Sequence, residues 1–197
     1  MGRVRLENDA KLTFEILMRT AFGYGYIPQF LYSDNEEESK IFIMRDSPQR
    51  LRKVPSIIIS CTSSDFSIDE LGPTAQRFEN ISDDPDSLPD EDRLVEFRGH
   101  AKLDIAFDIF AGSRQDRDMI SDFAAICLRF LFRNKAAENG FEYTKILLGS
   151  DGFEFDDDVT YYTKTITVSC QSEFHETIPI ELVDIINEII VDVEVQY

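Results

Sequence analysis

The residues of this chain that could assemble a catalytic metal site are carboxylates, because carboxylate oxygens bind divalent cations. Asp104, Asp108, Glu142 and Asp156 are the candidates. Asp104 and Asp108 lie on one face of an alternating strand pattern, which separates them by about 13 Å of strand rise. That separation is too long for one metal ion. The spacing therefore favours the solvated face of an amphipathic strand over a metal centre.

Other residue types give little support for catalysis. The sequence Glu154–Asp158 (EFDDD) lacks the glycine and the terminal glutamate of an EF-hand loop, which favours a solvated turn. The two histidines, His100 and His175, lie beside no cysteine or serine arrangement suited to nucleophilic work. No glycine-rich phosphate-binding motif is present in the sequence. We therefore expect no enzyme, no catalytic residue, no metal ligand and no cofactor.

A strand followed by a helix over Phe97–Phe132 is the clearest structural pattern. Apolar and polar residues alternate from Lys102 to Ile109, which is the period of a half-buried strand. The face predicted to lie inward holds Leu103, Ile105, Phe107 and Ile109, and the other face holds Lys102, Asp104, Ala106 and Asp108.

The helix that follows has a clear start signal. Ser113 is a suitable N-cap, and Asp116, three positions on, forms an acidic variant of the capping box. Asp116 and Asp118 also place negative charge in the first turn, where the helix dipole favours it. The apolar residues recur at three- and four-residue spacing and predict a core helix through Ile120, Phe123, Ala124, Cys127, Leu128, Phe130 and Leu131.

The remaining elements complete an α+β pattern, with a mainly antiparallel sheet packed by two or three helices over a single domain, 1–197. An amphipathic helix is predicted over Leu6–Phe22, with Leu6, Leu12, Ile16, Leu17 and Phe22 apolar. Strands are predicted at Ile41–Met44, Ser56–Cys61, Glu142–Leu148 and Thr160–Gln171, with a hairpin-like turn at Gly149–Gly152 and a last helix at Ile180–Ile190.

Two acidic segments interrupt these elements. Asp34–Glu38 (DNEEE) is predicted to be a solvated loop. Asn80–Asp92 contains two prolines and six acids, a composition typical of an exposed loop or a disordered insertion. Its acids are Asp83, Asp84, Asp86, Asp90, Glu91 and Asp92.

The charge balance restricts the partners of the chain. Thirty-eight acids against 20 bases give a formal net charge of −18, which repels nucleic-acid phosphates and disfavours a general DNA- or RNA-binding role. No apolar run approaches the roughly 18 residues needed to span a bilayer, so we expect a soluble protein with no membrane partner.

The three cysteines are far apart in sequence and are expected to be buried free thiols in a reducing compartment; they are Cys61, Cys127 and Cys170.

The order of these features resembles that of tail terminator and tail-completion (neck) proteins of tailed phages. Those proteins share a proline before an apolar strand, a glycine opening a long alternating strand, and a small-polar turn with arginine and acids at a helix start. The resemblance covers about residues 54–170. It is carried here by Val54–Ile59, Leu71–Gly72, Phe97–Gly99, Leu103–Phe107, Ala111–Asp118 and the later strand Tyr161–Cys170.

The resemblance implies a structural virion protein, assembled in the host cytoplasm, that forms a ring with copies of itself. The ring is expected to be hexameric and to lie at the head-proximal end of the tail. There it would cap the tail tube and sheath and join them to the head connector proteins. Closed cyclic symmetry would use up an exposed sheet edge in every subunit. If the acidic loop Asn80–Asp92 faces the lumen, DNA would pass through without sticking.

Two arginines are candidates for the contact between subunits. Arg114 and Arg117 stand at the start of the central helix, where the dipole disfavours cations, which suggests partners on an acidic neighbour. Two other interpretations stay open. One is another virion ring, such as a head-completion or baseplate protein, and the other is an unrelated acidic carboxylate-metal enzyme or adaptor.

Overall fold

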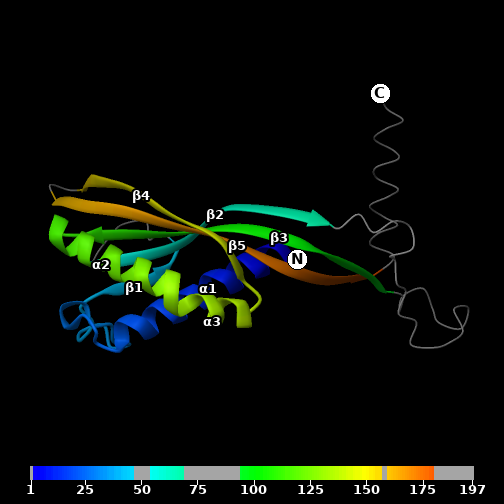
Figure 1. Cartoon of the computed structure of the whole chain (residues 1–197), viewed down its shortest axis with the longest axis horizontal. Coiled ribbons are helices and arrows are strands. Elements are labelled where there is room, and N and C mark those ends of the chain that lie inside the picture. The colour runs from blue at the N-terminus through cyan, green and yellow to red at the C-terminus, as the bar shows by residue number, and fades with distance from the viewer. Residues whose placement is uncertain (1, 47–53, 69–93, 157–158, 180–197) are drawn as a thin grey trace, which may run out of the picture. The chain divides into compact units, whose positions relative to one another are not determined.

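The computed structural model describes residues 2–46, 54–68, 94–156 and 159–179. Over these residues the chain forms an α+β arrangement, a five-stranded mixed sheet packed with two helices (Figure 1). The strands lie in the order β1-β2-β3-β5-β4. Their bounds are β1 (Phe42–Arg45), β2 (Ser56–Ile68), β3 (Leu94–Ala111), β4 (Glu142–Asp156) and β5 (Val159–Pro179).

The directions of the strands correct one part of the expected fold. β4 and β5 form the predicted antiparallel pair, in register from Glu142 opposite Gln171 to Asp156 opposite Val159. β1 and β2 run parallel, with Phe42 opposite Ser56. The α+β class is confirmed, but the sheet is mixed. Alternation of apolar residues predicts that a strand exists and which face is buried, and it carries no information on the direction of the neighbouring strand.

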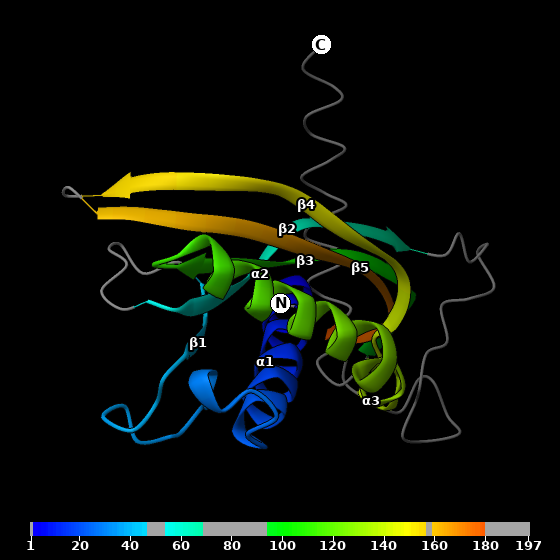
Figure 2. The same cartoon turned by 60° about the vertical axis from the view of Figure 1, so that its left-hand side comes forward.

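Two helical segments cover one side of the sheet (Figure 2). The first is α1 (Gly2–Gly23), followed by a single turn, η1 (Pro28–Phe30). The second runs without a break through α2 (Arg114–Ile126), η3 (Cys127–Leu131) and α3 (Phe132–Glu138). It ends before Gly140, whose φ of 85° lies in the left-handed region that glycine adopts freely.

The segment η3 is a π-helical turn, and it changes which residues face the core. A π turn adds a residue to the local repeat, so side chains beyond it rotate relative to regular helical spacing. Phe132 is buried, whereas Phe130 and Leu131 are exposed. The prediction that Phe130 and Leu131 belong to the core was wrong, because the π turn rotates Leu131 outward and Phe130 lies on the same side of the helix as the exposed Ile126. Ile120, Ala124, Cys127 and Leu128, which precede this rotation, are buried as predicted.

The helix α1 is present as predicted, but its buried face is different. Leu12 and Ile16 were expected among its apolar contacts, and both are exposed. The face that meets the core contains Phe14 and Met18 together with Phe22, which was predicted. The ring of Phe14 packs edge-on against Phe107 of β3, with ring centroids 5.5 Å apart. A mixture of apolar residues around the whole helix made the face ambiguous in sequence.

The inward face of β3 is as predicted, since Leu103, Ile105, Phe107 and Ile109 are all buried. On the other face Lys102 is exposed, Asp104 and Asp108 are half-buried, and Ala106 is buried.

The segment Gly149–Gly152 lies within β4 and forms no hairpin turn, so that prediction was wrong. β4 continues to Asp156, and its register against β5 shifts between Leu148 and Asp151. A Cβ at Gly149 would lie 2.9 Å from the carbonyl oxygen of Thr165, and one at Gly152 would lie 2.6 Å from the Thr163 hydroxyl. The glycines therefore allow close approach of β5 at a bulge.

The chain divides into two compact units. The first contains the described residues up to Asp65 together with Ala101–Ser172. The second contains the described residues of Phe66–His100 and those from Glu173 onward, and in it the rings of Phe66 and Phe174 lie 5.7 Å apart. The expectation of a single domain stays a prediction. The predicted acidic loop Asn80–Asp92 and the predicted helix Ile180–Ile190 lie outside the described residues.

Candidate assembly surface

The start of α2 has the predicted cap. The Ser113 hydroxyl oxygen accepts a hydrogen bond from the Asp116 backbone N–H at 3.1 Å. The same hydroxyl donates to the Asp116 carboxylate at 2.8 Å. The extended backbone of Ser113 leads straight from the end of β3 into the helix. This short connection fixes the direction in which α2 leaves the sheet.

Ser113→Ala is expected to lower the free energy of unfolding by about 1 kcal/mol, because it removes the acceptor of a helix N-terminal N–H. Chemical denaturation monitored by circular dichroism would measure the change. Ser113→Asp keeps an acceptor at the cap and is the matched control. Equal losses in both variants would contradict the capping role.

Arg114 is exposed at the first position of α2. Its guanidinium carbon lies 5.9 Å from the centre of the Tyr162 ring on β5, a cation–π distance. Arg114 therefore has a partner within its own chain, which offsets part of the unfavourable helix dipole. Its placement at a contact between subunits stays a prediction.

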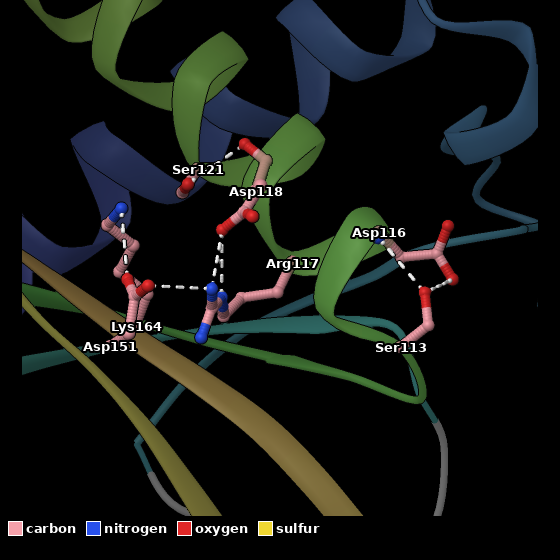
Figure 3. Close-up of polar contacts among 7 residues, drawn as sticks. All are labelled: Ser113, Asp116, Arg117, Asp118, Ser121, Asp151 and Lys164. Carbon is pink, nitrogen blue, oxygen red and sulfur yellow. Dashed lines mark hydrogen bonds and ion pairs between the residues drawn. The ribbon is translucent and has the colours of Figure 1, made fainter.

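Arg117 is buried in its own chain, with 2% of its side chain exposed, and is not a surface arginine. Its guanidinium donates to the Asp118 carboxylate at 2.7 and 3.0 Å and to the Asp151 carboxylate at 2.8 Å (Figure 3). The acidic partners inferred from the helix dipole exist, but they belong to α2 and β4 of the same chain. Arg117 therefore needs no acidic partner from a neighbouring subunit, and its prediction as an interface residue is not supported.

Asp151 links this arginine to β5. The Lys164 ammonium group lies 3.3 Å from the Asp151 carboxylate, opposite it in the strand register. The hydrogen bond from Lys164 is the main cause that lowers the pKa of Asp151, and attraction to Arg117 adds to it. Because folding lowers this pKa, the contribution of Asp151 to stability is present at neutral pH. It is lost as the pH falls through the folded-state pKa, below 3.8.

Two of the four carboxylates considered for a metal site, Asp104 and Asp108, have other partners. Asp104 accepts a hydrogen bond from Ser169, and Asp108 accepts one from Thr165 at 2.6 Å, so both join β3 to β5. Within the described parts of the chain, no group of three or more histidine, cysteine, aspartate or glutamate side chains could hold a metal ion.

Two of the three cysteines are buried thiols. Burial raises the pKa of Cys127 to about 11 and that of Cys170 to about 12, so both thiols are protonated at neutral pH. Cys61 is half-buried and also a free thiol. The prediction of buried free thiols is confirmed for Cys127 and Cys170, and Cys61 is more accessible than expected.

The acids of the predicted lumen-facing loop, Asp83, Asp84, Asp86, Asp90, Glu91 and Asp92, lie outside the described residues. The other acidic segment, Asp34–Glu38, is described, and each of its residues is exposed. Its prediction as a solvated loop is confirmed.

The last strand in the sheet order, β4, carries exposed apolar side chains at Leu147, Leu148 and Phe153. A strand at the end of a sheet presents one row of backbone N–H and C=O groups away from its neighbour, and another strand can pair with that row. This surface was not predicted from sequence, because Gly149–Gly152 was interpreted as a turn. The uninterrupted apolar residues before Gly149 and at Phe153 were the available signal.

A second exposed apolar surface lies on the helix at and around η3, where Ile126, Phe130 and Leu131 are more than half exposed. Helical spacing alone assigned the last two to the core. The signal for this surface lies in the charges that accompany it, because the stretch from Phe123 to Ala137 has three bases and no acid in a chain of net charge −18.

Over the described residues, the chain is an α+β protein whose sheet ends at β4, with exposed apolar side chains on that strand and on the helix at η3. No family model matches the chain. Its sequence also matches no curated protein. None of the described helices is long and apolar enough to cross a membrane.

Proposed function

We propose that this chain is a structural subunit of a phage virion ring at the head-proximal end of the tail. Copies of the chain form the ring, expected to be hexameric, which terminates the tail tube and sheath and meets the head connector proteins. The protein is part of the virion and acts by binding rather than by catalysis. Another virion ring, at the head or the baseplate, would use the same assembly surfaces.

The single observation that carries this proposal is the edge strand β4. It is 15 residues long, has no neighbouring strand on its outer side among the described strands, and exposes Leu147, Leu148 and Phe153. Long apolar edges promote association unless they are covered. A closed ring covers such an edge in every subunit and leaves no subunit with a free end.

Charge also supports a ring around DNA. A net charge of −18 leaves the subunit with a strong negative potential, which repels phosphates at long range. A wall that repels DNA lets it slide through a lumen without binding. The strand and capped helix from Leu94 to Ile126 include part of the pattern on which the phage resemblance rests.

The proposal predicts a protein that is monomeric or weakly associated when dilute and that forms closed rings at high concentration or on the ends of tail tubes. Mass photometry and negative-stain images would detect the rings. Leu148→Lys should prevent them, because a charge on an edge strand blocks pairing. Ile16→Lys, which places the same charge on an exposed part of α1, is the matched control. A wild-type protein that forms no rings, alone or with tail tubes, would contradict the proposed function.

A further inference from the structure

The helical segment around η3 exposes apolar side chains in an unusual way. Phe130 is 76% exposed, Leu131 57% and Ile126 52%. Leu131 lies three positions after the buried Leu128, so regular helical spacing would turn it toward the core, and the π turn η3 rotates it to the surface. Phe130 lies four positions after the exposed Ile126 and shares its side of the helix. π turns are rare and occur frequently at functional sites. The rotation leaves a cluster of large apolar side chains in contact with solvent, which marks a binding surface more often than a monomer surface.

Two arginines accompany these apolar residues. Arg129 and Arg133 are exposed, and neither forms an ion pair with any residue in the described ranges. They lie three and seven positions after Ile126, and positions three or four apart are neighbours on a helix. We call the set Ile126, Arg129, Phe130, Leu131 and Arg133 the basic-apolar surface. Its charge is opposite to that of the chain as a whole, so it attracts an acidic partner.

An acidic partner of fixed shape is present on the same unit. In the acidic loop 34–38, Asp34, Glu36, Glu37 and Glu38 are exposed. Asn35 organises the loop, because its side-chain oxygen accepts from the Glu37 N–H at 3.2 Å and its carbonyl accepts from the Glu38 N–H at 3.1 Å. A preformed loop loses little conformational freedom when it binds.

The two surfaces lie at different edges of the first unit (Figure 2). The basic-apolar surface adjoins α3, which packs against β4 at one end of the strand order. The acidic loop 34–38 leads into β1, the strand at the other end. Surfaces at opposite edges of one subunit can meet only between copies, and they do so head to tail.

We propose that the basic-apolar surface of one copy docks on the acidic loop 34–38 of the next copy. The contact rests on the proposed function and names the partner surface within the ring. Two basic-apolar surfaces facing each other would bring arginines against arginines, which disfavours a two-fold contact. A head-to-tail contact repeats around a ring, and it is the type that cyclic closure requires.

Charge reversal tests the contact directly. The helix variant carries Arg129→Glu and Arg133→Glu, and the loop variant carries Glu36→Lys, Glu37→Lys and Glu38→Lys, which makes the loop basic. Each variant alone should associate at least about tenfold more weakly than the wild type, because like charges then face each other. An equimolar mixture should regain association, since both kinds of contact in an alternating assembly bring opposite charges together. Sedimentation velocity at several concentrations would measure all three samples.

One control, one further test and a stability check accompany these variants. Lys102→Glu changes the charge of an exposed residue on β3 and should leave association unchanged. Phe130→Ala removes an apolar contact without changing charge and should weaken association. Thermal melts should place all variants near the wild type, because every substituted side chain is exposed.

The outcomes separate this contact from the proposed function. Rings that persist in both reversed variants, or a mixture that does not recover, would overturn the contact and leave the ring proposal standing. Head-to-tail association that recovers in the mixture, but yields no ring on tail tubes, would support the contact and overturn the proposed function. Binding of the wild type to phosphatidylserine vesicles, lost in the helix variant while self-association is unchanged, would assign the basic-apolar surface to lipid and overturn the contact.

Discussion

Phe107→Ala is expected to lower the free energy of unfolding by about 3–5 kcal/mol, the range of large-to-small changes at buried aromatic residues. Phe107 is completely buried on β3, and its ring packs edge-on against Phe14 of α1 at 5.5 Å. Truncation removes this contact between the sheet and the first helix. It also leaves a cavity in a close-packed interior, which the surrounding side chains fill only in part.

Chemical denaturation would measure this loss. Phe130→Ala is the matched control, because it is the same substitution at a residue that is 76% exposed, and it should change the stability by less than about 0.5 kcal/mol. Similar losses in the two variants would show that the buried face of β3 or the rotation at η3 has been assigned wrongly. Phe107→Leu, which keeps most of the volume, should give an intermediate value.

The strand β3, the cap at Ser113 and the start of α2 could all be predicted from sequence. Each depends on residues close together in the chain, through period-two alternation or a cap three residues long. The buried face of β3 followed in the same way, because alternation assigns every second residue to the core.

Features that depend on distant residues could not be predicted. The ring of Phe107 packs on Phe14 of α1, which is far from it in sequence. The ring of Phe123 packs on Phe22 of the same helix, with ring centroids 5.0 Å apart. Sequence periodicity shows that two faces are apolar and cannot show which face meets which.

The glycines of β4 illustrate a second limit. Gly149 and Gly152 surround a serine and an aspartate, a composition typical of turns. The structure uses them for the close approach of Thr163 and Thr165 on β5. Composition alone does not separate a turn from a bulge, because glycine is favoured in both.

The two arginines at the start of α2 have partners, as the unfavourable helix dipole predicts, but those found in the structure belong to the same chain. Their placement at a contact between subunits is not tested by these contacts. Arg114 finds the Tyr162 ring, and Arg117 finds Asp118 and Asp151. Asp151 is 34 positions away from Arg117 in sequence, so no local pattern connects them. Among the described residues, the β4 edge, the basic-apolar surface and the acidic loop 34–38 are exposed to solvent.

Arg117 therefore supports the fold, and this role leads to a second large effect. Arg117→Ala is expected to lower the free energy of unfolding by about 2–5 kcal/mol, as truncation of a long buried side chain does. The substitution removes the bonds that hold α2 to β4 through Asp151 and leaves a cavity beneath the first turn of the helix. The carboxylates left behind are about half exposed, so they regain water and add little further cost.

Arg117→Met separates the two parts of that loss. It keeps the length of the side chain and removes its charge, so the loss should be less than about 1.5 kcal/mol, because the volume is nearly kept and the two carboxylates left without a partner are about half exposed to water. Arg114→Ala, the same truncation at an exposed arginine of the same helix, should have a small effect. Thermal and chemical denaturation of the three variants would rank them. If Arg117→Ala behaves like Arg114→Ala, Arg117 is a surface residue, and its original assignment to a contact between subunits is restored.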